Sequence, residues 1–74
     1  MGSDVGERLL QAWLAWDAQP RSAGTAHAME DACGAAARRL GWTSSQLRDR
    51  LSVERRAGRT HRQALERLGL VDRA

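Results

Sequence analysis

The sequence predicts an all-α fold, a small bundle of about four helices that forms a single domain over residues 1–74. A chain of 74 residues supplies apolar side chains for one thin core, which excludes a second domain. Apolar residues recur at intervals of three and four, which is the spacing of amphipathic helices. Breaks containing glycine, proline and serine separate the apolar segments, so each segment is expected to form one helix.

The first helix is expected over residues 4–18, where Ser3 or Asp4 is placed to cap it and the apolar side chains share one face. Two interpretations of this face remain open. Its side chains belong to the core or to a dimer seam, or its tryptophans bind a partner. The possible dimer or partner surface comprises Leu9, Leu10, Trp13, Leu14 and Trp16.

A second helix is expected to begin after a break at Pro20, with Thr25 as its N-cap, and to run to Leu40. Gly34 lies in the middle of this helix, where glycine is unfavourable, and is expected to mark a close crossing with the first helix. The predicted buried line is formed by Met29, Ala32 or Cys33, Ala36, Ala37 and Leu40.

A third helix is expected over residues 44–57. Gly41 can adopt the positive φ that ends the preceding helix, and either Thr43 or Ser44 can cap the new one. The predicted buried side of the third helix is formed by Leu47 and Leu51.

Thr60 is expected to cap a fourth helix over residues 62–68, which Gly69 ends. The following Leu70 and Val71 are expected to fold back onto the core. The apolar side of this last helix comprises Ala64, Leu65 and Leu68.

Residues 35–51 combine small residues, a turn glycine and spaced leucines. The pattern consists of Ala36 and Ala37 in one helix, Gly41 in the turn, Trp42 after it, and Leu47 and Leu51 on the buried side of the next helix. This segment resembles the C-terminal helix-turn-helix of the Fis (factor for inversion stimulation) family, which is also the DNA-binding end of many bacterial enhancer-binding activators. The resemblance implies a helix-turn-helix over about residues 26–57.

Charge is distributed unevenly along the chain. Residues 1–31 contain two arginines and five acidic residues, a net charge of −3, whereas residues 32–74 contain ten arginines and four acidic residues, a net charge of +6. The pI is about 11.0. The basic half contains the predicted helix-turn-helix, which favours an anionic partner such as nucleic acid or an acidic protein surface.

We therefore expect a small DNA-binding protein, either a transcriptional regulator or a nucleoid or recombination accessory factor, that binds double-stranded DNA as a homodimer. The richness in arginine, alanine and glycine without any lysine indicates a GC-rich bacterial or phage genome. Residues near the start of the third helix would meet base edges, and further arginines would neutralise phosphates. The candidate DNA-binding residues are Thr43, Ser44, Ser45, Arg48 and Ser52, together with Arg38, Arg39, Arg55, Arg56, Arg59 and Arg62.

An alternative interpretation treats these arginines as a solvated face whose charges pair with Asp49 and Glu54. A separate hypothesis for the function is a helical adaptor or inhibitor, which binds an acidic protein partner through the tryptophan-containing first helix, the basic face or both. The acidic N-terminal half of the chain and Asp49 in the third helix motivate this second hypothesis.

Catalysis and metal binding are not expected. The chain has one cysteine and two histidines without the spacing of a metal site, and no catalytic residues or cofactor-binding loop can be assigned. The lone Cys33 excludes an internal disulfide, and no long apolar run indicates a membrane segment, so a cytoplasmic location is expected.

Overall fold

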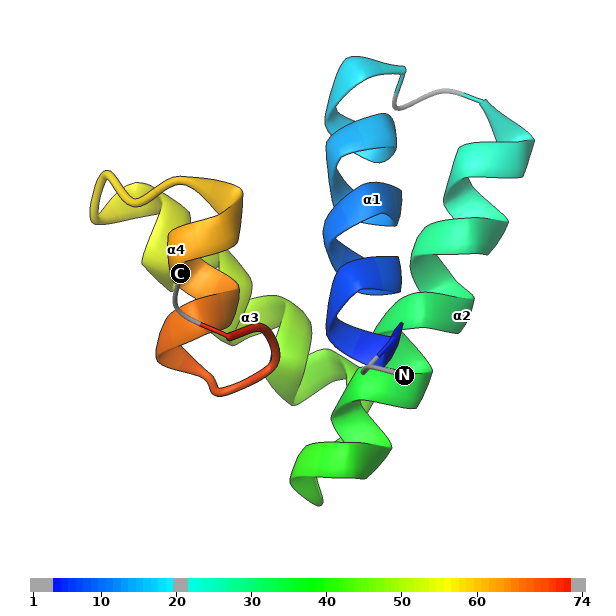
Figure 1. Ribbon diagram of the computed structural model, residues 1–74. Coiled ribbons are helices and arrows are strands. Elements are labelled where there is room, and N and C mark those ends of the chain that lie inside the picture. Colours follow the sequence, from blue (N-terminus) through cyan, green and yellow to red (C-terminus); the bar gives the residue numbers. More distant parts are fainter. Residues whose placement is uncertain (1–3, 20–21, 73–74) are drawn as a thin grey trace.

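The computed structural model describes residues 4–19 and 22–72, and within these ranges every regular element is an α-helix (Figure 1). The predicted all-α bundle is therefore confirmed. The expected cap at Ser3 and the break at Pro20 lie outside the described residues. The helices are α1 (Asp4–Ala18), α2 (Ala23–Leu40), α3 (Ser44–Arg56) and α4 (His61–Arg67).

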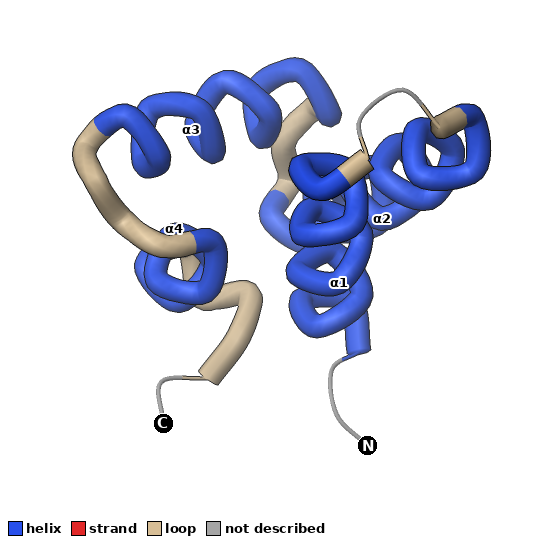
Figure 2. The backbone as a smooth tube through the Cα atoms, turned by 90° about the horizontal axis from the view of Figure 1, so that it is seen from above, coloured by secondary structure: helices blue, strands red, loops and turns tan. Residues whose placement is uncertain are grey.

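The helices pack in a closed cycle. α1 and α2 form an antiparallel pair, α3 packs against the end of α2, and α4 packs against α3 and returns to α1 (Figure 1). Figure 2 shows α3 extending away from the α1–α2 pair, with α4 beside it. One cluster of buried side chains lies inside this cycle. It comprises Leu9, Leu10, Ala12, Trp13, Met29, Ala32, Cys33, Ala36, Ala37, Leu47, Leu51, Ala64, Leu65, Leu70 and Val71.

Local capping groups define the ends of the later helices. Gly41 ends α2 with a φ of 75°, and the Thr43 hydroxyl accepts a hydrogen bond from the backbone N–H of Gln46, which confirms Thr43 as the cap of α3. The Gln46 side chain in turn accepts the Thr43 N–H, completing a capping box. Thr60 forms the same arrangement with Gln63 at the start of α4, as its predicted role as a cap requires.

The N-terminus of α2 differs from the prediction. Its N-cap is Ser22, whose hydroxyl accepts the backbone N–H of Thr25 at 3.4 Å. The Thr25 hydroxyl instead donates to the backbone carbonyl oxygens of Gln19 and Ser22, each at 2.9 Å. Thr25 therefore lies inside the first turn, and its predicted role as the N-cap is wrong. Serine and threonine both suit the N-cap position, so the local sequence does not distinguish Ser22 from Thr25.

The close approach to α1 that was predicted at Gly34 is absent, and a different close approach, between α1 and the C-terminal segment, occurs at Gly6. A Cβ atom at Gly34 would meet only the Ser44 hydroxyl of α3, at 3.7 Å, so the expected tight crossing with α1 is wrong. A Cβ atom at Gly6 would lie 1.6 Å from the backbone carbonyl oxygen of Leu70. The C-terminal segment therefore packs directly on the backbone of α1, and Leu70 and Val71 are buried as predicted.

Side chains of α4 also hold this helix against α1. The His61 ring packs edge-on against Trp13, with ring centroids 4.4 Å apart, and its Nε2 atom lies 2.5 Å from a carboxylate oxygen of Asp17. The Arg62 guanidinium donates to the Glu7 carboxylate at 3.3 Å. The contacts of His61 therefore join α4 to α1, and the exposed Arg62–Glu7 pair adds little to the stability of this packing.

Candidate nucleic-acid interface

α3 has a buried side and an outward side of contrasting chemistry. Its buried side consists of Leu47, Leu51 and Glu54. A helix turns by about 100° per residue, so the residues between these positions face away from the bundle. The outward side is exposed and is formed mainly by small or short side chains. These residues are Ser45, Asp49, Ser52, Val53 and Arg56.

One flank of α3 borders a groove of about 510 Å³ that separates it from the C-terminal half of α1. Arg48 and Arg55 line this groove from α3, while Trp16 and Asp17 line it from α1. The Arg48 guanidinium also lies beside the buried thiol of Cys33. Burial raises the pKa of this thiol above its ordinary value of 9.0, and the charge and hydrogen bond of Arg48 offset only part of that rise.

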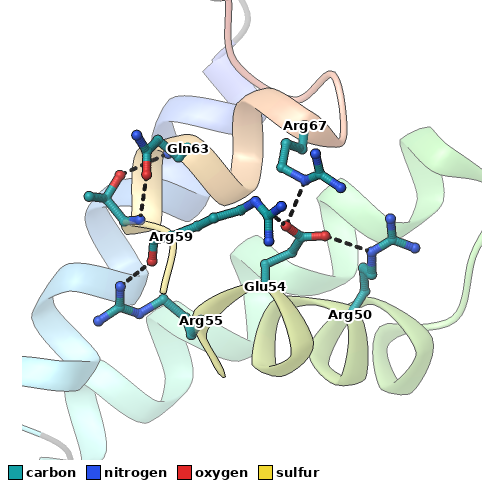
Figure 3. Close-up of polar contacts among 7 residues, drawn as sticks. Arg50, Glu54, Arg55, Arg59, Gln63 and Arg67 are labelled. Carbon is teal, nitrogen blue, oxygen red and sulfur yellow. Dashed lines mark hydrogen bonds and ion pairs between the residues drawn. The ribbon is translucent and has the colours of Figure 1, made fainter. Parts of the chain in front are cut away.

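Beside the opposite flank of α3, three arginines gather around one buried carboxylate (Figure 3). The side chain of Glu54 is 3% exposed. Its Oε2 atom accepts from Arg50 Nε at 3.0 Å, and its Oε1 atom accepts from Arg67 Nε at 2.8 Å. The Arg59 Nε atom lies 3.3 Å from the same Oε1 atom. Glu54 is therefore an ion-pair partner of Arg50 and Arg59, as the alternative interpretation expected, and it is buried because α4 and the preceding loop cover its side of α3.

The ionisation of Glu54 follows from this environment. Burial alone raises the pKa of the carboxyl group. This effect is outweighed by the hydrogen bond from Arg50, by the charge and hydrogen bond of Arg67, and by the charge of Arg59. The pKa of Glu54 is therefore below its ordinary value of 4.5. Because the pKa of Glu54 is lower in the folded state than in the unfolded state, ionised Glu54 stabilises the fold. This contribution is complete at pH values above the pKa of Glu54 in the unfolded chain.

This linkage predicts an acid-dependent loss of stability. As the pH falls from 4.5 through the folded-state pKa of Glu54, the contribution of the carboxylate is lost. We expect Glu54→Gln to be less stable than wild type at pH 7 and to lose less stability on acidification. Urea denaturation followed by circular dichroism at neutral and acidic pH measures both effects. Glu30→Gln, at an exposed position on α2, is the control and should retain the wild-type acid dependence. An equal acid response in Glu54→Gln and wild type would contradict the assignment.

The structure separates the candidate DNA-binding residues into two groups. Arg59 and Arg62 are engaged by carboxylates, in ion pairs with Glu54 and Glu7 respectively. The other candidates are exposed, and none of their side chains is in an ion pair among the described residues. They are Arg38 and Arg39 at the end of α2, and Thr43, Ser44, Ser45, Arg48, Ser52, Arg55 and Arg56 at the start of α3 and along it.

Two residues of the arginine cluster were not among the candidates. Arg50 was detectable from the sequence, because it stands four residues before Glu54 on the same helix. Arg67 stands thirteen residues after Glu54 and belongs to another helix. Its position beside Glu54 depends on how α4 packs, so no local pattern identifies it.

The proposed partner surface on α1 is largely internal. Leu9, Leu10 and Trp13 are buried in the core, so within the monomer they are not available to a partner. Leu14 is 42% exposed, and Trp16 is partly buried at the groove beside α3. Most of the apolar side chains of α1 therefore belong to the core, because both α2 and α4 pack on them. This outcome agrees with the interpretation of this face as core.

Comparison with protein-family models, with curated proteins and with solved structures finds no match for this chain. The resemblance of residues 35–51 to the Fis-type helix-turn-helix therefore stays a prediction. None of the helices within residues 4–19 and 22–72 combines the length and the hydrophobicity of a membrane-spanning segment. The same described residues contain no group of three side chains suited to hold a metal ion.

Proposed function

We propose that this protein binds double-stranded DNA by placing α3 in the major groove, as a regulator or accessory factor of a bacterium or phage. One observation carries the proposal. Four of the five residues on the outward side of α3 have short side chains and the fifth is Arg56, whereas further arginines lie on both flanks of the helix. A major groove admits one α-helix and has a phosphate backbone along each edge, so this distribution of charge is complementary to it.

The flanks would contribute most of the affinity. Arg48 and Arg55 are about two helical turns apart and share the side that faces α1. Arg50 lies on the other side, with the cluster around Glu54. Phosphate contacts on both strands would orient α3 along the groove and release counterions, which makes binding strongly dependent on salt.

Any sequence preference would come from the outward side. Ser45 and Ser52 can donate to or accept from base edges, and Arg56 can bind guanine through two hydrogen bonds. Asp49 accepts hydrogen bonds only, and the exocyclic amine of cytosine is the base group that matches it. The acidic residue is therefore compatible with base contacts, provided that the arginines on the flanks neutralise the nearby phosphates.

The test is a titration of a fluorescent random-sequence duplex with the protein at several salt concentrations, followed by anisotropy. We expect the logarithm of the association constant to fall linearly with the logarithm of salt concentration. A slope between about −3 and −6 is expected if roughly four to six phosphates are neutralised. Light scattering on the same samples reports whether one protein or a homodimer binds. An absence of binding at low salt would contradict the proposal.

A second candidate function rests on α1. Leu14 is 42% exposed, and Trp16 borders the groove beside α3, so these two side chains offer apolar contact area to a protein partner. Leu14→Ser separates the two functions, since DNA affinity should not change when this residue is replaced. A protein captured by wild type and lost with Leu14→Ser, in a nuclease-treated lysate, would favour the adaptor.

A further inference from the structure

The cluster around Glu54 contains more positive charge than the buried carboxylate requires. Arg50, Arg59 and Arg67 contribute three guanidinium groups, whereas one is enough to neutralise Glu54. Glu66 lines the adjoining hollow and offsets part of the excess. The cluster as a whole, with three cations and two carboxylates, keeps a net positive charge that is directed to solvent.

The three guanidinium groups approach Glu54 in the same way. Each one faces the carboxylate with its Nε atom, at 3.0 Å for Arg50, 3.3 Å for Arg59 and 2.8 Å for Arg67. Among the described residues, no hydrogen bond uses the terminal Nη atoms of these three side chains. Their side chains remain 46%, 35% and 48% exposed, so the terminal N–H groups are accessible.

Glu54 also fixes the three groups relative to one another. They come from α3, from the loop after it and from α4, and among the described residues only the shared carboxylate joins all three (Figure 3). A hollow of about 420 Å³ lies beside them and is lined by Arg59, Gln63, Glu66 and Arg67. Guanidinium groups held in place in this way lose little side-chain entropy when they bind a ligand.

We propose that Arg50, Arg59 and Arg67, organised by Glu54, form a binding site for one phosphate group. Terminal guanidinium N–H groups match the oxygens of a tetrahedral phosphate and bind them in charge-assisted pairs. The phosphate belongs either to the backbone of bound DNA or to a free phosphate ion. The identification of the DNA source rests on the proposed function, whereas the site itself does not.

The test uses the full chain and inorganic phosphate, added at constant ionic strength against sodium chloride. Side-chain Nε–H resonances of the arginines are followed by ¹H–¹⁵N NMR. We expect the resonances of Arg50, Arg59 and Arg67 to shift saturably with phosphate concentration. The resonance of Arg38, which lies outside the cluster, should show no saturable shift. Arg67→Gln leaves two arginines on Glu54 and should weaken phosphate binding at least about tenfold, the loss expected for one charge-assisted hydrogen bond. Glu66→Gln removes the opposing charge and should strengthen binding.

The outcomes separate the site from the proposed function. Linear shifts of equal size at Arg38 and at the cluster would overturn the site, as would unchanged phosphate affinity in both Arg67→Gln and a folded Arg50→Gln variant. Saturable phosphate binding in a protein that does not bind duplex DNA would support the site and contradict the proposed function. Saturable phosphate binding that duplex DNA displaces would support the site and assign the backbone as its source.

Discussion

Gly6→Ala is expected to destabilise the protein by about 2–5 kcal/mol. The added Cβ atom would lie 1.6 Å from the carbonyl oxygen of Leu70, a distance that no rotamer change relieves because both atoms are fixed to backbone. The segment after Gly69 would have to move away, and this would expose Leu70 and Val71, which are now 2% and 8% exposed. A chain of 74 residues has a total stability of roughly 4–11 kcal/mol, so a large part of that stability would be lost.

Gly34→Ala is the matched control, because the same substitution in another helix interior has the opposite expected sign. The nearest atom to its added Cβ is the Ser44 hydroxyl oxygen at 3.7 Å, an ordinary van der Waals contact. Replacing a helical glycine with alanine then stabilises by up to about 1 kcal/mol. Urea denaturation of both variants measures the difference. Equal stability of Gly6→Ala and wild type would contradict the close packing of Leu70 on α1.

The variant Arg48→Gln, Arg55→Gln, Arg56→Gln is expected to lose DNA affinity on the order of 1000-fold at about 50 mM salt. All three side chains border the groove between α3 and α1, and none is in an ion pair among the described residues. The slope of log affinity against log salt should decrease in magnitude by about two, because Arg48 and Arg55 are the two of these residues assigned to phosphates. Salt-dependent anisotropy gives both quantities, and circular dichroism checks that the variant is folded.

A control variant shows whether position or total charge determines this loss. Arg8→Gln with Arg62→Gln removes two positive charges, one exposed on α1 and one paired with Glu7 of α1. Exposed ion pairs contribute little to stability, so this variant should fold normally. It is expected to bind DNA with nearly the wild-type salt slope. Comparable losses per charge in both variants would mean that net charge, and not the face of α3, governs binding.

Much of the fold could be predicted because its signals are local. The caps Thr43 and Thr60 act on residues three positions away, and Gly41 ends α2 by its own φ of 75°. The two errors at helix level, at Thr25 and Gly34, have a common reason. Each residue suits its predicted role locally. The observed role of Thr25 depends on its contacts with the carbonyl groups of Gln19 and Ser22, and the surroundings of Gly34 depend on which helix packs beside it.

The candidate site was predicted less completely. Exposure of Arg48 and Arg55 followed from their spacing relative to Leu47 and Leu51 on α3. The burial of Glu54 did not, because a glutamate is seldom buried unless cations from other elements cover it. The groove beside α3 likewise depends on Trp16 of α1, which is far away in the chain.

The sequence by itself determined four helices, most of their ends and a basic C-terminal half, because these properties depend on neighbours within a few residues. Only the tertiary structure decided which arginines are paired and which are accessible. The pairs of Arg67 with Glu54 and of Arg62 with Glu7 join residues 13 and 55 positions apart. Charges interact according to distance in space, and helix packing alone sets that distance for side chains so far apart along the chain.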